Sequence, residues 1–111
     1  MSYDIVVSDV FRRSAKSLSK KYPSFKKDLA TLVEKLSVNP KMGTPLGGNL
    51  FKIRISIESK GKGKSGGARI ITFVLHQDEK ILLAEVYDKS NYSTVNEKEI
   101  LRNLRDEGLI S

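Results

Sequence analysis

The sequence contains no cysteine and only one histidine. Without cysteine there is neither a disulfide framework nor a thiolate metal site. His76 alone cannot supply a cluster of histidine ligands or a histidine pair for acid–base catalysis. We therefore expect a site that uses no metal and no cofactor.

Long apolar runs are also missing. No stretch approaches the roughly 20 apolar residues of a membrane-spanning helix. The first residues, MSYDIVVSDVF, lack the basic-then-apolar order of a secretion signal. We expect a cytoplasmic protein that does not contact a membrane. The 111 residues suffice for one hydrophobic core but not for two, so the predicted single domain covers residues 1–111.

Negative charge is scarce as well. The chain has 13 Asp and Glu residues against 20 Lys and Arg residues, which gives a formal net charge of +7. Its hydrophobic content of 39% and charged content of 30% are ordinary for a globular protein. The charge excess favours a nucleic acid, a ribosome or an acidic protein as the partner.

The most informative stretch, residues 50–71, reads LFKIRISIE–SKGKGKSGG–ARII. Because side chains alternate along a strand, its first part predicts a strand with one apolar face and one cationic face. Lys52 and Arg54 lie on the cationic face. The apolar face is formed by Phe51, Ile53, Ile55 and Ile57.

A glycine-rich loop joins this strand to the next one, which Arg69 opens. Six cations and one acid lie between Lys52 and Arg69, and three of these cations are in the loop. Glycines let backbone N–H groups approach an anion closely, and lysines neutralise phosphate. The alternative is a solvated connection that is basic only for solubility. The cations of the flanking strand favour binding, because a merely solvated loop does not require them. The loop lysines are Lys60, Lys62 and Lys64.

The other elements follow from apolar periodicity and from proline and capping residues. We expect the order β-α-α-β-β-β-α, an α+β fold with a mostly antiparallel sheet and an N-terminal helical hairpin on one face. Seven cations without an acid lie between Arg12 and Lys27, either as a solvated helix face or as a binding surface. The expected elements are a strand over residues 3–8, a helix capped by Ser8 or Asp9 and ended by Pro23, a helix capped by Ser24 that ends before Pro40, a loop over 41–49, strands over 50–58, 69–76 and 81–89, and a helix capped within 93–96.

Four segments carry a family likeness: YPSFKKDL, NPKMGTPL, FKIRISIESKGKGKSGGARIITF and AEVYDKSNYS. Their order and spacing resemble the RelE/HigB-type toxins of bacterial type II toxin–antitoxin systems, in the RelE/ParE superfamily, over nearly the whole chain. The resemblance implies a RelE-like fold and an mRNA interferase, a metal-independent endoribonuclease that cuts mRNA in the ribosomal decoding site and contacts ribosomal RNA. It also implies a cognate antitoxin that covers the basic surface.

The resemblance further implies a site. Lys52 and Arg54 match family cations on the second strand, and Arg69 matches an arginine that opens the third strand. Lys89 replaces a family arginine, and lysine keeps the charge but loses the bidentate fork. Either Tyr92 or Tyr87 matches the aromatic residue that stacks on a base. The expected catalytic residues are Lys52, Arg54, Arg69, Lys89 and Tyr92, and the expected RNA-binding residues are Lys60, Lys62, Lys64 and Tyr87.

RNA cleavage by the 2′-hydroxyl needs a base, stabilisation of the developing charge and an acid for the leaving oxygen. Lys52 is our candidate base on the condition that neighbouring cations depress its pKa, as like charges do. Arg69 suits the phosphate, since a guanidinium binds two oxygens at once. Lys89, Arg54 or a loop lysine would supply the acid. We expect Asp88 to restrain the chain end or to pair with a cation.

Two other functions fit the same resemblance. The ParE branch blocks DNA gyrase without cutting RNA, and a third possibility is an inactive relative that retains the fold. Three lysines among glycines favour RNA over a protein target.

Overall fold

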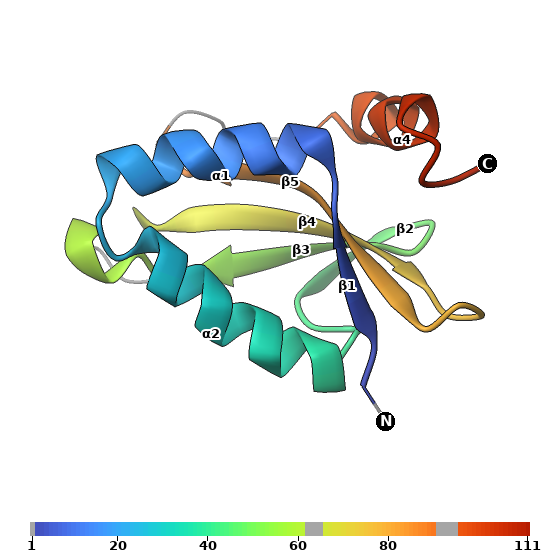
Figure 1. Ribbon diagram of the computed structural model, residues 1–111, viewed down its shortest axis with the longest axis horizontal. Helices are drawn as coiled ribbons and strands as arrows, with labels where there is room; N and C mark the ends of the chain where they lie inside the picture. Colours follow the sequence, from blue (N-terminus) through green and yellow to red (C-terminus); the bar gives the residue numbers. More distant parts are fainter. Residues whose placement is uncertain (1, 62–65, 91–95) are drawn as a thin grey trace.

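The computed structural model describes residues 2–61, 66–90 and 96–111 (Figure 1). Within these residues a five-stranded sheet combines with α-helices, as expected for the α+β class. The elements are β1 (Asp4–Val7), α1 (Asp9–Lys21), α2 (Phe25–Val38), β2 (Thr44–Gly47), β3 (Leu50–Ile55), the 3-10 turn η1 (Glu58–Lys60), β4 (Ala68–Leu75), β5 (Lys80–Asp88) and α4 (Glu97–Asp106).

The strands lie in the order β1-β5-β4-β3-β2. Among the strands of the described residues, β1 and β5 pair in parallel, and the other three pairs are antiparallel. The apolar start of β5, Ile81 to Ala84, is at most 3% exposed because β5 lies between β1 and β4 and is covered on both faces. The predicted burial of this strand on both faces is confirmed.

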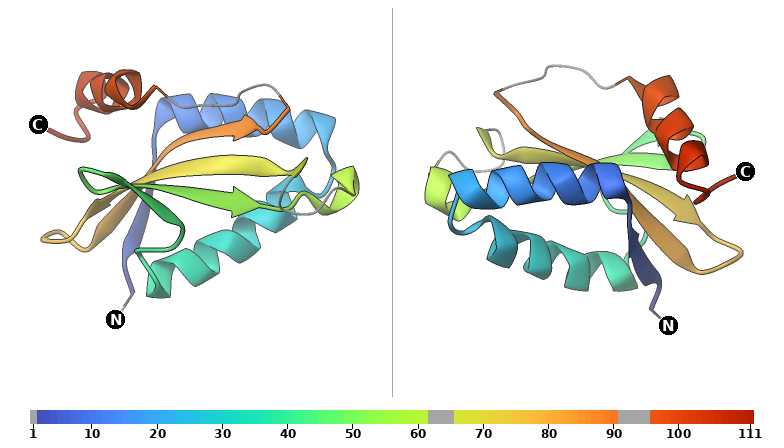
Figure 2. Two further views of the ribbon diagram at one scale, coloured as in Figure 1. Left: turned by 180° about the vertical axis from the view of Figure 1, so that it is seen from behind. Right: turned by 45° about the horizontal axis from the view of Figure 1, so that its top comes forward.

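The helices α1 and α2 form a hairpin over one face of the sheet (Figures 1 and 2). Ser8 begins α1, since its hydroxyl accepts a hydrogen bond from the Phe11 amide at 3.1 Å. Proline at position 23 ends α1 as predicted. Phe11, Phe25 and Leu36 fill the space beneath the helices and are at most 1% exposed.

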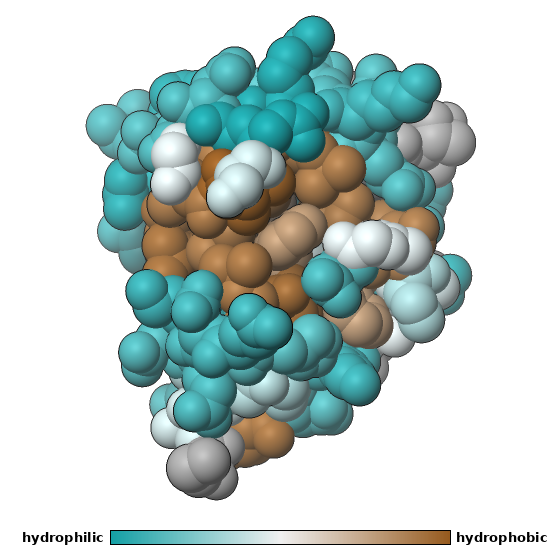
Figure 3. Space-filling model, turned by 90° about the vertical axis from the view of Figure 1, so that its right-hand side faces the viewer, coloured by the Kyte–Doolittle hydropathy of each residue, from teal (hydrophilic) through white to brown (hydrophobic). Residues whose placement is uncertain are grey.

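The opposite face of the sheet is only partly covered, by α4 (Figure 2). The Asn96 side chain caps α4 by accepting from the Glu99 amide at 3.1 Å. Ile100 and Leu104 pack on the sheet, and further apolar side chains around them stay half-exposed. Figure 3 shows a continuous apolar surface at this end of the molecule. Six half-exposed residues of this cluster, which we call the apolar end, are Leu46, Phe73, Leu75, Leu101, Leu109 and Ile110.

The predicted loop over residues 41–49 is wrong in part, because Thr44–Gly47 forms the edge strand β2. Pro45 and Gly47 are typical of loops, but an edge strand tolerates them since its outer side needs no ladder hydrogen bonds. The pairing with β3 is irregular between Pro45 and Gly47. Over the described residues the order is therefore β-α-α-β-β-β-β-α, with η1 after β3.

The strand expected over residues 50–58 ends at Ile55. The chain then turns into η1, where the Glu58 amide donates to the Asp28 carboxylate at 3.0 Å. Gly67 marks the start of β4, and a Cβ there would collide with the Ile55 carbonyl oxygen. Glycine is therefore required for the close approach of the two chain segments.

Candidate functional site

The register of three strands aligns two arginines and a tyrosine. Arg54 of β3 is the Cα partner of Arg69 of β4, which is in turn the partner of Tyr87 of β5. Ile53 and Ile55 pack beneath the helices, so Arg54 between them points to the opposite, open face. We call Arg54, Arg69 and Tyr87 the cross-strand row. Directly opposed side chains have Cβ atoms about 4.5–5.5 Å apart, so the like charges of the two arginines favour an anion beside them.

Lys52 lies next to this row on the same face. Its Cα partner in β4 is Ile71, whose partner in β5 is Glu85. The structure thus brings together Lys52, Arg54, Arg69 and Tyr87, although they come from three different strands. The predicted clustering of cations on one strand face is present in the fold.

The two arginines of the row differ in exposure. Arg54 is exposed, whereas Arg69 is 4% exposed. The Arg69 Nη1 donates to the Ala68 carbonyl oxygen at 3.1 Å. Arg69 is therefore held in a fixed orientation, while Arg54 is directly accessible to a ligand.

Tyr87 is 8% exposed. Burial raises the pKa of its phenol, which the positive charge of Arg69 opposes. The phenol therefore keeps its proton at neutral pH and is available as a hydrogen-bond donor. Its electrostatic coupling to Arg69 agrees with their direct pairing across the sheet.

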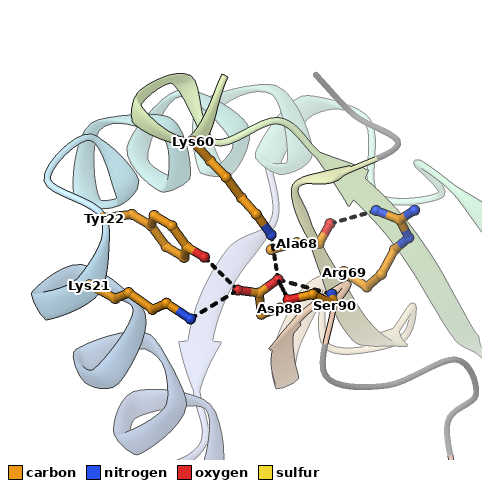
Figure 4. A network of polar contacts seen from close by, with 7 residues as sticks. All are labelled: Lys21, Tyr22, Lys60, Ala68, Arg69, Asp88 and Ser90. Carbon is orange, nitrogen blue, oxygen red and sulfur yellow. Dashed lines mark hydrogen bonds and ion pairs between the residues drawn. The ribbon is translucent and has the colours of Figure 1, made fainter. Parts of the chain in front are cut away.

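Beside the row, on the helix-covered side, Asp88 is the centre of a polar network (Figure 4). Its Oδ1 accepts from the Lys60 Nζ at 2.5 Å and its Oδ2 from the Tyr22 hydroxyl at 2.8 Å. The Ser90 amide and hydroxyl also donate to Oδ1, and Lys21 Nζ lies 3.9 Å from Oδ2. The prediction that Asp88 pairs with a neighbouring cation is confirmed.

This network determines the charge state of Asp88. Burial alone would raise the pKa of the carboxyl, but hydrogen bonds from Lys60, Ser90 and Tyr22 outweigh it and hold the pKa well below its usual range. The ammonium groups of Lys60 and Lys21 each lie 5.4 Å from the centre of the Tyr22 ring, on either side of it in Figure 4. The carboxylate is thus ionised and fully engaged at neutral pH.

Lys60 does not match the alternative of a solvated loop cation. Its side chain is 10% exposed and is directed to Asp88. Its expected role in RNA binding stays a prediction, but its observed contact is structural. Lys62, Lys64 and Tyr92 lie outside the described residues. Lys89 is half-buried, and its amide donates to the Gly67 carbonyl at 3.0 Å, which fixes its backbone beside the start of β4.

The η1 turn has a second attachment that sequence reasoning missed. The Ser24 hydroxyl accepts from the Ser59 amide at 2.8 Å and donates to Asp28 at 2.8 Å. Ser24 was expected to cap α2, but it makes no capping bond to the helix and contacts η1 instead. No local pattern links residues 35 positions apart, so the sequence held no signal for this contact.

His76 is exposed, as expected for a residue beside the β4–β5 turn, and its ring stands edge-on to Tyr3 with 6.4 Å between centroids. In the described parts of the chain, no three His, Cys, Asp or Glu side chains gather as a metal site requires. Nor does any helix in these parts have the length and apolar character to cross a membrane.

Two comparisons with known proteins concern the family and the fold. A family model described as the RelE toxin of the RelE/RelB toxin–antitoxin system matches residues 7–106. The fold is similar to that of a doubly substituted mutant of the Escherichia coli toxin RelE in the free state, with a TM-score of 0.59 and 14% sequence identity. That match covers 96% of this chain and 97% of the other.

Proposed function

Because the chain belongs to the RelE toxin family, we propose that this toxin is an mRNA interferase that cuts message in the ribosomal decoding site. The observation that supports the proposal best is the cross-strand row with Lys52 beside it. Three cations and a protonated phenol on one face match the needs of a phosphodiester that gains negative charge during cleavage.

We assign the residues the following roles, using their positions as the guide. Arg69, which is buried and oriented, holds the phosphate, because a fixed guanidinium donates to two oxygens at once. The exposed Arg54 neutralises the charge that develops on the same phosphate. Lys52 acts as the base for the 2′-hydroxyl. Tyr87 is buried within the row and keeps its proton, so Tyr92 is our candidate for stacking on a base.

The acid for the leaving 5′-oxygen is Lys89. Its backbone is fixed by Gly67, and it follows directly after the network around Asp88. Lys62 and Lys64 supply additional positive charge for mRNA and ribosomal RNA. Their contribution would be non-specific and would weaken as salt is raised.

A toxin of this family has an antitoxin partner. We infer that the antitoxin presents an amphipathic segment with acidic side chains. An acidic part of the segment would cover the cross-strand row, and an apolar part would cover the apolar end (Figure 3). Exposed apolar surfaces of this kind mark protein-binding sites. Because part of the attraction is electrostatic, the affinity should fall as salt is raised.

The test uses translating ribosomes that hold a defined codon in the decoding site. Added toxin should cut the message there, and sequencing the new 5′ ends should place the cut within that codon. Intact message at every codon would refute the proposal. A supercoiling assay run in parallel would then show whether the protein inhibits DNA gyrase, as toxins of the ParE branch do. For the antitoxin, co-expression of the adjacent reading frame should restore growth, and equal arrest with and without it would refute the pairing.

A further inference from the structure

Asp88 and Tyr87 are neighbours in β5, and their side chains point to opposite faces of the sheet. Tyr87 belongs to the cross-strand row on the open face. Asp88 points to the helix-covered face, where Tyr22 and Lys60 donate to it (Figure 4). Any rotation of this part of β5 that moved Asp88 would therefore also move Tyr87.

The Asp88 network joins three parts of the chain that are distant in sequence. Tyr22 and Lys21 come from the end of α1, Lys60 comes from η1, and Ser90 follows β5. The Asp88 side chain is 1% exposed and that of Lys60 is 10% exposed. A buried ion pair of this kind fixes geometry, because loss of either partner leaves an uncompensated charge.

Asp88 also lies next to Arg69. The Cα partner of Asp88 across the sheet is Ala68, and the Ala68 carbonyl accepts the hydrogen bond of the Arg69 guanidinium. The position of Asp88 is thus linked to two members of the row. One link is the peptide bond to Tyr87, and the other is the paired backbone of Ala68.

We propose that Asp88 is a positioning residue for the reaction, an inference that rests on the proposed nuclease function. Its bonds to Lys60 and Tyr22 hold the end of β5 so that Tyr87 stays opposite Arg69. Asp88 does not touch the substrate, since its side chain lies on the face away from the row. Its effect is on the orientation of the groups that do.

The test compares Asp88→Asn, which keeps the shape of the side chain but removes its charge, with the milder Tyr22→Phe. Asp78→Asn is the matched control, because Asp78 lies exposed in the β4–β5 turn. All variants are studied at a temperature at which circular dichroism shows them folded. On programmed ribosomes, Asp88→Asn should lower the saturating cleavage rate by roughly tenfold or more, as expected for misplaced groups. The toxin concentration that gives half the maximal rate should change little.

Lys60→Met provides a second criterion. If Lys60 acts through Asp88, the double variant Lys60→Met/Asp88→Asn should cut no more slowly than the slower single variant. A merely structural network predicts another result: lower melting temperatures, with the folded fraction cutting at the wild-type rate. That result would overturn the inference, as would multiplied losses in the double variant.

A measurement on the free protein separates this inference from the nuclease proposal. Asp88→Asn and Tyr22→Phe should shift the NMR signals of the Tyr87 ring and the Arg69 Nε–H group, whereas Asp78→Asn should not. Unchanged signals would overturn the inference even if the wild type cuts. Shifted signals with a wild type that cuts at no codon would support the positional link and refute the nuclease instead.

Discussion

The two faces of the sheet are made by alternate residues of the same strands, yet they differ in burial and in charge. On the helix-covered face, Ile53 and Ile55 are at most 6% exposed beneath the two helices. On the open face, Lys52 and Arg54 alternate with them and face no helix of the N-terminal hairpin. Period-two alternation therefore lets one six-residue strand serve both the core and the site.

The charged side chains of the two faces also have different surroundings. Asp88, on the covered face, is surrounded by donors and held ionised. On the open face, two arginines of like charge, Arg54 and Arg69, are placed directly opposite each other. This pairing concentrates positive charge on the face that we propose binds the phosphate.

The largest effect on stability should come from the covered face. Phe25→Ala removes a side chain that is 0% exposed and should lower the free energy of unfolding by about 3–5 kcal/mol. Phe73→Ala is the matched change on the open face, where the ring is half-exposed. Its cost should be clearly smaller. Urea unfolding measures both, and equal losses would contradict the contrast between the faces.

The largest effect on activity should come from the open face. Arg69→Ala should lower cleavage by roughly 10²-fold or more, the usual cost of losing one transition-state donor. Because Arg69 is 4% exposed, the melting temperature of the Arg69→Ala variant should fall as well. Cleavage rates are therefore compared on folded protein. Arg54→Ala, at an exposed position, should lower cleavage without lowering the melting temperature.

Arg69→Lys refines this prediction. Lysine restores a point charge but not the two-oxygen contact, so cleavage should remain impaired. Full toxicity in cells and full activity of Arg69→Ala on programmed ribosomes would place the site elsewhere.

A smaller effect is expected at the start of α1. Ser8→Ala removes the cap on the Phe11 amide and a hydrogen bond to the Ala84 carbonyl at 3.2 Å. It should cost about 1 kcal/mol of stability, measured by urea unfolding. Ser17→Ala in the same helix is the control, since Ser17 is exposed and its replacement should leave stability unchanged or slightly raised. Equal losses at both positions would show that the cap contributes nothing specific.

The smallest effect concerns pH. Burial raises the pKa of Glu85 above its ordinary value of 4.5, although bonds from Val86 and Ser14 and the charge of Arg13 oppose it, and Glu99 adds to the shift. As pH rises past 4.5, the unfolded chain loses this proton first. The folded state then holds more protons, so the free energy of unfolding falls with rising pH.

Glu85→Gln should remove that part of the pH dependence. As pH rises from about 4 to about 7, the range over which a raised carboxyl titrates, the urea midpoint of the variant should rise relative to that of the wild type. Parallel profiles would contradict the assignment. Asp88 affects stability in the opposite direction, because the fold lowers the pKa of its carboxyl. Its contribution to the free energy of unfolding is present when the pH is above 3.8, the ordinary pKa of this group, and is lost only as the pH falls further.

The sequence predicted those features that depend on local pattern. The alternation around Ile53 placed Lys52 and Arg54 on one face, and the apolar start at Ile81 placed β5 inside the sheet. Both follow from side-chain period and composition, which are readable over a few residues.

The features that the sequence did not reveal depend on contacts between distant residues. Tyr22 and Asp88 are 66 positions apart, and nothing near either residue indicates the other. Lys60 was indistinguishable from its loop neighbours, although the fold buries it against Asp88. Strand β2 was missed because Pro45 and Gly47 disfavour a strand, and only the free edge of β3 makes one possible.

The parallel pairing of β1 with β5 has a consequence for synthesis. The β1 residues 4–7 pair with residues 80–83, so β1 cannot pair until β5 has been synthesised. A nascent chain that has released only α1, α2 and β3 from the ribosome still lacks β5 and its neighbour β4. It can therefore complete neither the core nor the cross-strand row. Both can form only after residues 80–88 have left the ribosome, so a shorter nascent chain does not yet present the row to an antitoxin.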